Sequence, residues 1–128
     1  DRLLSVLPNV AAHHCSPGVP YGFEQRLREG TWMGHILEHV IIELMEMAGL
    51  EAGFGQTRET TQSGTYRMVF RVPDETVGRV ALASGLALLH AVINKQDFDV
   101  EPELAAAAVR DRRGHQQRAA AQRALVRA

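Results

Sequence analysis

The sequence predicts a small α+β domain, and three of its features support that prediction. Apolar residues recur every three or four positions over residues 32–47 and again over residues 77–92, the spacing of amphipathic helices. Between these stretches, residues 56–72 are rich in β-branched and aromatic residues around a Ser-Gly pair, which is typical of a β-hairpin. The end of the chain is mostly Ala, Arg and Gln and predicts a helix with few large apolar groups. We therefore expect one domain over residues 1–98, followed by a helical tail or linker over residues 99–128.

Length, charge and cysteine content narrow the class of protein. The 128 residues suffice for one domain with one core, and the chain opens at Asp1 rather than Met, so we expect a piece of a longer polypeptide. The net charge of −1 gives no overall attraction to nucleic acid or to a membrane surface. We find no signal peptide and no apolar run approaching the roughly 18 to 20 residues of a spanning helix. The single cysteine, Cys15, excludes an internal disulfide and fits the reducing cytoplasm.

Short helices separated by a loop are predicted for the first part of the chain. Residues 3–7 are apolar enough for a short helix that Pro8 stops. The Pro and Gly residues within positions 13–22 predict a loop. Residues 23–29 then predict a second short helix, which Gly30 closes.

The first long helix follows directly. Thr31 is placed to cap it, and Gly49 ends it. Its Trp and Met side chains either line a substrate pocket or belong to the core, and their helical spacing favours the core. These residues are Trp32, Met33, Met45 and Met47.

The predicted hairpin ends at Pro73, and a second long helix begins there. Asp74 is a suitable N-cap for this helix, which we expect to run to about Lys95. Gly78 and Gly85 lie within it and either weaken it or allow a neighbouring element to approach closely.

The first long helix contains an H-x-x-E-H motif formed by His35, Glu38 and His39. At helical spacing the two histidines lie on one face a turn apart, with the glutamate beside them. Two imidazoles can then hold one zinc ion while the carboxylate reaches its bound water, the arrangement of a zinc hydrolase. Ordinary packing or surface histidines are the alternative. We predict Zn²⁺ as the cofactor and Glu38 as the general base.

A hydrolytic zinc site needs a third protein ligand. Glu43 lies one turn beyond the second histidine, about 6 Å by helical rise, and reaches the ion poorly, so it suits support from behind a ligand. Glu75 begins the next long helix, and H-x-x-E-H hydrolases generally use a downstream Glu, so we expect Glu75 as the third ligand. We place His13 with Glu43 behind the ligands. Cys15 is a nucleophile, a metal ligand or, more commonly for such residues, a small buried hydrophobe.

Several short motifs surround this helix in a fixed order. They are Leu7-Pro8, His13-His14-Cys15-Ser16, Gly22-Phe23, Arg26-Leu27, Glu29-Gly30-Thr31-Trp32-Met33-Gly34-His35, Glu38-His39, Glu43-Leu44, Ala48-Gly49, Phe54-Gly55, Thr57-Arg58-Glu59-Thr60 and Gly64-Thr65-Tyr66. Together they closely resemble the N-terminal domain of cyanophycin synthetase over about residues 3–81, with weaker likeness through Lys95. The sequence departs from the usual pattern at Ala12, Phe23 and Gln56, which bears on polymer contacts more than on the metal site.

The resemblance implies a substrate and partner domains. Cyanophycin is a nitrogen-storage polymer with a poly-aspartate backbone that carries arginine on each side chain. In the family, ATP-grasp and Mur-ligase-like domains follow the N-terminal domain and extend the polymer with ATP. The N-terminal domain holds the polymer and, in some members, cleaves it slowly to give primers. The H-x-x-E-H of that site matches His35, Glu38 and His39.

Two functions therefore follow from the sequence. One is a zinc peptidase acting on cyanophycin, and the other is a non-catalytic module that anchors the polymer for the ligase domains. An anchor has no need of a base beside two ligands, which favours the peptidase. Acidic residues such as Glu29 and Glu59 are candidates to hold guanidinium groups, and Arg26 and Arg58 to pair with carboxylates, with surface ion pairs as the alternative. A homo-oligomer is a further possibility.

Overall fold

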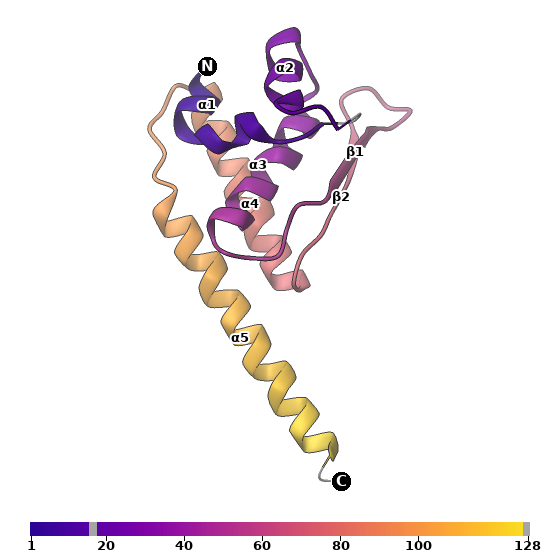
Figure 1. Cartoon of the computed structure of the whole chain (residues 1–128), viewed down its shortest axis with the longest axis vertical. Helices are drawn as coiled ribbons and strands as arrows, with labels where there is room; N and C mark the ends of the chain where they lie inside the picture. The colour runs from indigo at the N-terminus through magenta and orange to yellow at the C-terminus, as the bar shows by residue number, and fades with distance from the viewer. Residues whose placement is uncertain (16–17, 127–128) are drawn as a thin grey trace.

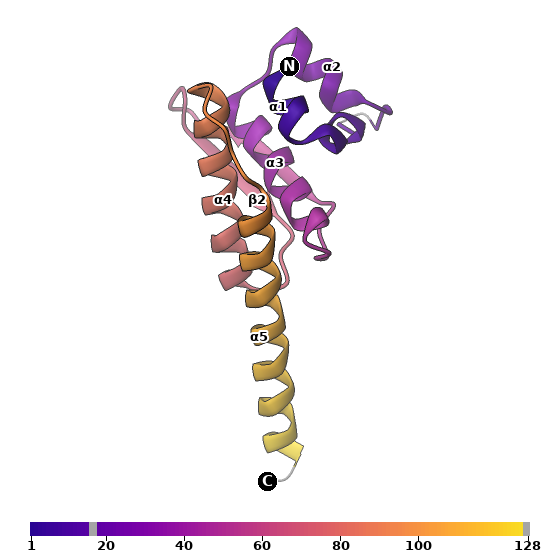
Figure 2. The same cartoon turned by 90° about the vertical axis from the view of Figure 1, so that its left-hand side faces the viewer.

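The computed structural model describes residues 1–15 and 18–126 and has the predicted α+β composition. Its elements, in chain order, are α1 (Arg2–Val6), a 3₁₀ helix (Pro8–Ala12), α2 (Gly22–Glu29), α3 (Met33–Met47), β1 (Gly55–Glu59), β2 (Tyr66–Phe70), α4 (Glu75–Ile93) and α5 (Glu101–Val126). Helices α3 and α4 lie side by side in the body of the molecule, with the hairpin along one flank and α1 and α2 above (Figures 1 and 2). The predicted helices and hairpin are thus confirmed.

The core lies between α3 and α4. Gly85, in the middle of α4, approaches α3 so closely that a Cβ there would lie 3.0 Å from Ile41 and 3.1 Å from Leu37. Of the two interpretations of this glycine, close approach is therefore the one the structure adopts. Ala81, one turn earlier on α4, packs instead with Ile41 and Met45, so α4 runs antiparallel to α3. Asp74 caps α4 as predicted, because its side chain accepts a hydrogen bond of 3.0 Å from the backbone N–H of Val77.

The hairpin covers the side of α3 that carries the motif. Strands β1 and β2 pair antiparallel, with Thr57 opposite Met68 and Gly55 opposite Phe70. These inward residues alternate with exposed ones such as Arg58, as expected for a hairpin with one face against a helix. The backbone N–H of Arg71 continues the ladder beyond β1 by donating to the carbonyl of Phe54 at 3.0 Å.

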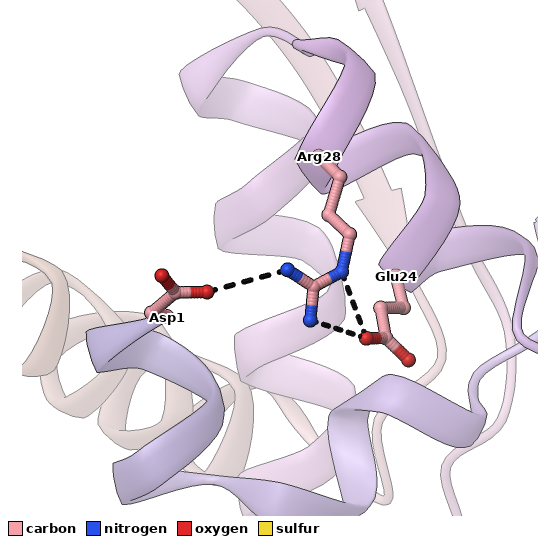
Figure 3. A network of polar contacts seen from close by, with 3 residues as sticks. All are labelled: Asp1, Glu24 and Arg28. Atoms are coloured by element: carbon pink, nitrogen blue, oxygen red, sulfur yellow. Dashed lines mark hydrogen bonds and ion pairs between the residues drawn. The ribbon is translucent and has the colours of Figure 1, made fainter.

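The N-terminal segment packs against both α3 and α4. Leu3, Leu7 and Val10 are buried in one cluster with residues of both long helices. At the surface, Arg28 on α2 joins α1 to α2 by pairing with Asp1 at 3.3 Å and with Glu24 at 2.7 Å (Figure 3). These groups are solvated, so the pairs contribute little to stability.

Helix α5 begins beside the core and extends far beyond it (Figure 1). Leu104 packs against the core cluster, and Glu103 accepts a short hydrogen bond from the buried Ser84 of α4. Further along, Arg118 pairs with Asp74 at 3.1 Å. The division between residues 1–98 and 99–128 stays a prediction.

Helix α4 is long and apolar enough, by length and composition, to cross a membrane, with a mean hydropathy of 1.6. The expectation that no segment approaches this length therefore needs correction. The helix uses its apolar residues in the core, where Val77, Leu88 and Leu89 are buried. Core helices that are mostly buried satisfy the same criteria of length and hydropathy.

Two details of α3 differ from the prediction. Trp32, not Thr31, is the N-cap residue, and no side chain caps the helix. Trp32, Met33 and Met47 are exposed, while Met45 is buried, so only part of the apolar period belongs to the core. Met33 and Met47 are the first and last residues of the helix and Trp32 precedes it, so these side chains lie at its ends, whereas Met45 lies within it.

Candidate metal centre

The two histidines of the motif converge at the N-terminal half of α3. Their Nε2 atoms lie 3.2 Å apart, and the ring centroids are 4.8 Å apart. This follows from helical geometry, since residues four apart project from one face of the helix. His35 is half-buried and His39 is buried.

Cys15 brings a third donor to the same point from a different element. Its Sγ lies 3.0 Å from the Nε2 of His35 and 3.4 Å from the Nε2 of His39. Tetrahedral zinc with two imidazoles and one thiolate requires N–N and S–N separations of about 3.3 and 3.6 Å. Among the described residues, these three form one of two groups whose donor atoms lie close enough to share a metal ion. A sulfur and two imidazole nitrogens are the donor types that zinc prefers, so the residues fit the cofactor.

Glu75, the expected third ligand, lies elsewhere. Its side chain is 79% exposed and pairs with Arg79 one turn later on α4. Gly85 is the residue of α4 that lies opposite Leu37, and Glu75 is ten residues earlier, roughly 15 Å away along the helix axis. Because α4 is antiparallel to α3, this displacement carries Glu75 toward the C-terminal end of α3, away from the histidines.

A polar partner orients each histidine through its other ring nitrogen. The Oγ1 of Thr31 lies 2.8 Å from the Nδ1 of His35, so the residue expected to cap the helix instead holds a candidate ligand. The Nδ1 of His39 lies 3.0 Å from the Nδ1 of His13, whose Nε2 is 2.8 Å from Glu43. Such outer partners fix ring orientation and tautomer at metal sites.

Both histidines are poised to be neutral at physiological pH. Burial lowers the pKa of His39 to about 3, with further lowering from the neighbouring His35 and His13. Burial also lowers the pKa of His35, and the charge of Arg26 contributes in the same direction. Only a neutral imidazole has a lone pair to offer a metal, so protons compete weakly for these two ligands.

Glu38 lies on the same helix, pressed against the hairpin. A Cβ on Gly55 would come within 2.6 Å of the Cγ of Glu38, so only glycine allows β1 to pass this close. The carboxylate is buried, and within the part of the chain that the structure describes its Oε2 has no hydrogen-bond partner. Burial raises the pKa of Glu38, against the lowering effect of a hydrogen bond with Thr57. A buried carboxylate with a raised pKa is suited to accept and release a proton.

These residues line one cleft of about 800 Å³ between the loop that holds Cys15, the start of α3 and the first strand of the hairpin. Cys15, His35, Glu38 and His39 all belong to its wall. Trp32 and Phe54 also line it, and each is 51% exposed. The cleft therefore places a candidate metal centre and a buried carboxylate beside aromatic surface that a ligand can cover.

Comparison with known proteins identifies related sequences. A sequence model described as the cyanophycin synthase-like N-terminal domain matches residues 1–94. The chain is similar to cyanophycin synthetase of Synechocystis sp., with 46% identity over 100 residues, which cover 78% of this chain and 12% of the relative. For the cyanophycin synthetases of Crocosphaera subtropica and Trichormus variabilis the identities are 43% over 101 residues and 45% over 95 residues, covering 79% and 74% of this chain and 12% and 10% of the relatives.

The chain belongs to the cyanophycin synthase-like N-terminal domain family. The recognition made from the sequence motifs is thereby confirmed. The chain spans only about a tenth of the length of these relatives.

In this cyanophycin synthase-like domain, the residues expected to contact polymer lie at different distances from the cleft. Arg58 and Glu59 line it, and Glu59 also accepts a hydrogen bond of 2.9 Å from the backbone N–H of Gly64. Arg26 is exposed on α2, near enough to His35 for its charge to act there. Glu29 is exposed on α2, accepts a hydrogen bond from Gln25, and does not line the cleft.

The sequence did not assign Cys15 as a metal ligand or Thr31 as a partner of His35. Cys15 had metal ligation among its open alternatives, but a buried hydrophobe is the commoner role. In the structure it is buried at 8% exposure and still turns its sulfur to both histidines. Its position two residues after His13, in a loop, is the signal that pointed to it. Thr31 gave no such signal. A threonine four positions before His35 is equally suited to cap the helix and to hydrogen-bond the histidine, so the sequence cannot distinguish the two roles.

Proposed function

We propose that this chain is a zinc-dependent peptidase domain that hydrolyses cyanophycin and so supplies shorter chains as primers for polymer synthesis. Cys15, His35 and His39 would hold the zinc ion, and Glu38 would be the general base. The proposal includes ATP-grasp and Mur-ligase-like partner domains and a cytoplasmic location, as expected for cyanophycin synthetase-like enzymes.

The convergence of three zinc-type donors beside a buried carboxylate is the observation that carries this proposal. Three donors come from two separate segments, within 3.4 Å of one another. Three protein ligands are the number used by catalytic zinc sites, which keep a fourth position open. The unpartnered Oε2 of Glu38 also needs an explanation, because leaving a buried polar atom unsatisfied costs free energy. A purely structural helix would gain stability from an apolar residue at this position.

Each residue then has a defined task. Zinc, when bound, lowers the pKa of water and polarises a carbonyl oxygen. Glu38 accepts a proton from the water that attacks the carbonyl carbon, and it delivers that proton to the departing nitrogen as the C–N bond breaks. Burial of Glu38 and its raised pKa support both transfers. The low pKa of His39 supports its role as a neutral ligand.

The residues of the cleft wall suit a polymer substrate that carries guanidinium groups. Trp32 and Phe54 are exposed aromatic residues of this wall, and guanidinium groups stack on aromatic rings. Glu59 adds a carboxylate, and Arg58 offers a partner for the free carboxylates of the polymer. One wall thus carries groups of both kinds that the proposed substrate requires.

The test is to incubate the zinc-loaded domain with soluble cyanophycin and follow chain length by gel and mass spectrometry. We expect shortening by the wild-type protein. Glu38→Gln removes a proton acceptor and no ligand, so it should keep the metal and slow cleavage by about 10²-fold or more. Polymer that binds to the zinc-loaded wild type without being shortened would replace this proposal with an anchoring module.

A further inference from the structure

His13 lies between a candidate zinc ligand and a buried carboxylate. Its Nδ1 is 3.0 Å from the Nδ1 of His39, and its Nε2 is 2.8 Å from Glu43. The His13 side chain is 12% exposed and that of Glu43 is 4% exposed, so water competes little for either contact. The backbone of His13 is fixed as well, because its carbonyl accepts a hydrogen bond of 3.2 Å from the N–H of Phe23.

Counting hydrogen-bond donors and acceptors in the chain His39–His13–Glu43 determines which ring nitrogen of each histidine carries the proton. A neutral imidazole has one N–H and one lone pair, so two facing Nδ1 atoms can bond only if one donates and the other accepts. Zinc on the Nε2 of His39 requires its Nδ1 to carry the proton and donate. The Nδ1 of His13 must then accept, and the proton of His13 must be on its Nε2, where it donates to Glu43.

We propose that Glu43 and His13 are positioning residues that select the metal-binding tautomer of His39. The acceptor at Glu43 draws the proton of His13 to Nε2, and the lone pair this leaves at Nδ1 draws the proton of His39 to Nδ1. The Nε2 of His39 is then left as a lone pair directed at Cys15 and His35. This inference rests on the proposed zinc site.

A rival reading gives His13 a different task. His13, Glu43 and Glu46 form the second group of described residues that could hold a metal ion, with Glu46 3.8 Å from His13. A metal on the Nε2 of His13 would move its proton to Nδ1, which would donate to His39 and leave the proton of His39 on Nε2. That proton would block the first site. The two clusters therefore cannot both bind a metal. Because Cys15, His35 and His39 fit zinc, we favour the arrangement in which Glu43 and His13 select the tautomer of His39, which we call the relay.

Matched variants separate the two readings. Glu43→Gln removes the buried carboxylate, whereas Glu46→Gln removes a neighbouring one that is 46% exposed and belongs only to the rival cluster. The experiment measures zinc affinity by competition with a chelator. It also records imidazole ¹⁵N–¹H spectra of the 128-residue chain at a pH well above the ordinary imidazole value of about 6.5. Melting curves confirm that each variant is folded.

We expect wild-type spectra with His39 protonated on Nδ1 and His13 on Nε2, both without zinc and with one equivalent. Glu43→Gln should weaken zinc binding about 10- to 100-fold, the usual cost of losing an outer partner, and should populate the opposite His13 tautomer. Glu46→Gln should change neither. A His39 proton on Nε2, equal weakening by both variants, or a second bound zinc lost in both would overturn the relay. A wild-type protein that binds no zinc would refute the proposed function, while the zinc-free spectra would still decide the tautomers.

Discussion

Helices α3 and α4 pack against each other and are both apolar, yet they bury different kinds of residue. In α4 the buried side chains are small or apolar, with Ser84 the polar exception among its described residues. In α3 three ionisable side chains are buried as well, namely Glu38, His39 and Glu43. Burying such groups opposes folding unless they are paired. The contrast fits a helix α4 that serves the core alone and a helix α3 that also holds the proposed metal site at some cost in stability.

The position of the buried polar groups supports this interpretation. Glu38 and His39 line the cleft, and Glu43 contacts His13, so all three face the N-terminal loop and the hairpin. Gly85 of α4 meets Leu37 and Ile41 on another side of α3. Helix α3 thus forms an apolar interface with α4 on one face and lines a polar cleft with another. Changes on the two faces should therefore have opposite consequences.

The largest expected difference is in stability. Leu88 of α4 is fully buried, so Leu88→Ala should lower the free energy of unfolding by about 2 to 5 kcal/mol. Glu38→Gln on α3 removes a buried charge that has an unpartnered oxygen, and it should leave the stability of the zinc-free protein unchanged or higher. Urea unfolding of both variants provides the measurement. If Glu38→Gln cost as much as Leu88→Ala, the division of roles between the helices would be refuted.

The next effect concerns which side chains hold the metal. Loss of an outer partner weakens zinc binding by up to roughly 100-fold. Cys15→Ala removes a ligand itself, so it should weaken zinc binding by at least that factor. Glu75→Ala should have no effect, since Glu75 is exposed and pairs with Arg79. Chelator competition measures both affinities. Weaker zinc binding in Glu75→Ala than in Cys15→Ala would restore the ligand set first expected from the sequence.

A more gradual effect is a pH dependence of the zinc-free protein. His39 has a pKa of about 3 when folded against 6.5 ordinarily, so between these values the unfolded chain binds more protons there. Stability should therefore fall as the pH is lowered through this window, by up to about 1.4 kcal/mol per pH unit from this group. The raised pKa of Glu38 opposes the trend above its ordinary value of 4.5. Urea unfolding at several pH values should show a shallower fall in His39→Gln, and identical slopes would contradict the assignment.

Local patterns in the sequence were enough to predict much of this arrangement. Apolar periodicity predicted α3 and α4, Asp74 was identified as a cap, and the Ser-Gly turn predicted the hairpin. Helical spacing also brought His35 and His39 together, because both lie on one element. Each of these features depends on residues close in the chain.

The third donor depended on how separate elements pack, which spacing does not encode. Glu75 and Cys15 were both eligible by residue type, and the antiparallel course of α4 decided between them by carrying Glu75 away. Likewise, nothing local distinguishes Thr31 as a cap from Thr31 as a partner of His35. Which side of α3 is covered by each segment distant in the chain is determined by tertiary packing, and local sequence patterns do not reveal it.

X-ray absorption at the zinc edge tests the central claim most directly, because it identifies the atoms bound to the metal. For the wild-type chain with one equivalent of zinc, we predict one sulfur at about 2.3 Å and imidazole nitrogens at about 2.0 to 2.1 Å. The sulfur signal should disappear in Cys15→Ala. A zinc shell of nitrogen and oxygen atoms alone in the wild-type protein would contradict a centre built from Cys15, His35 and His39.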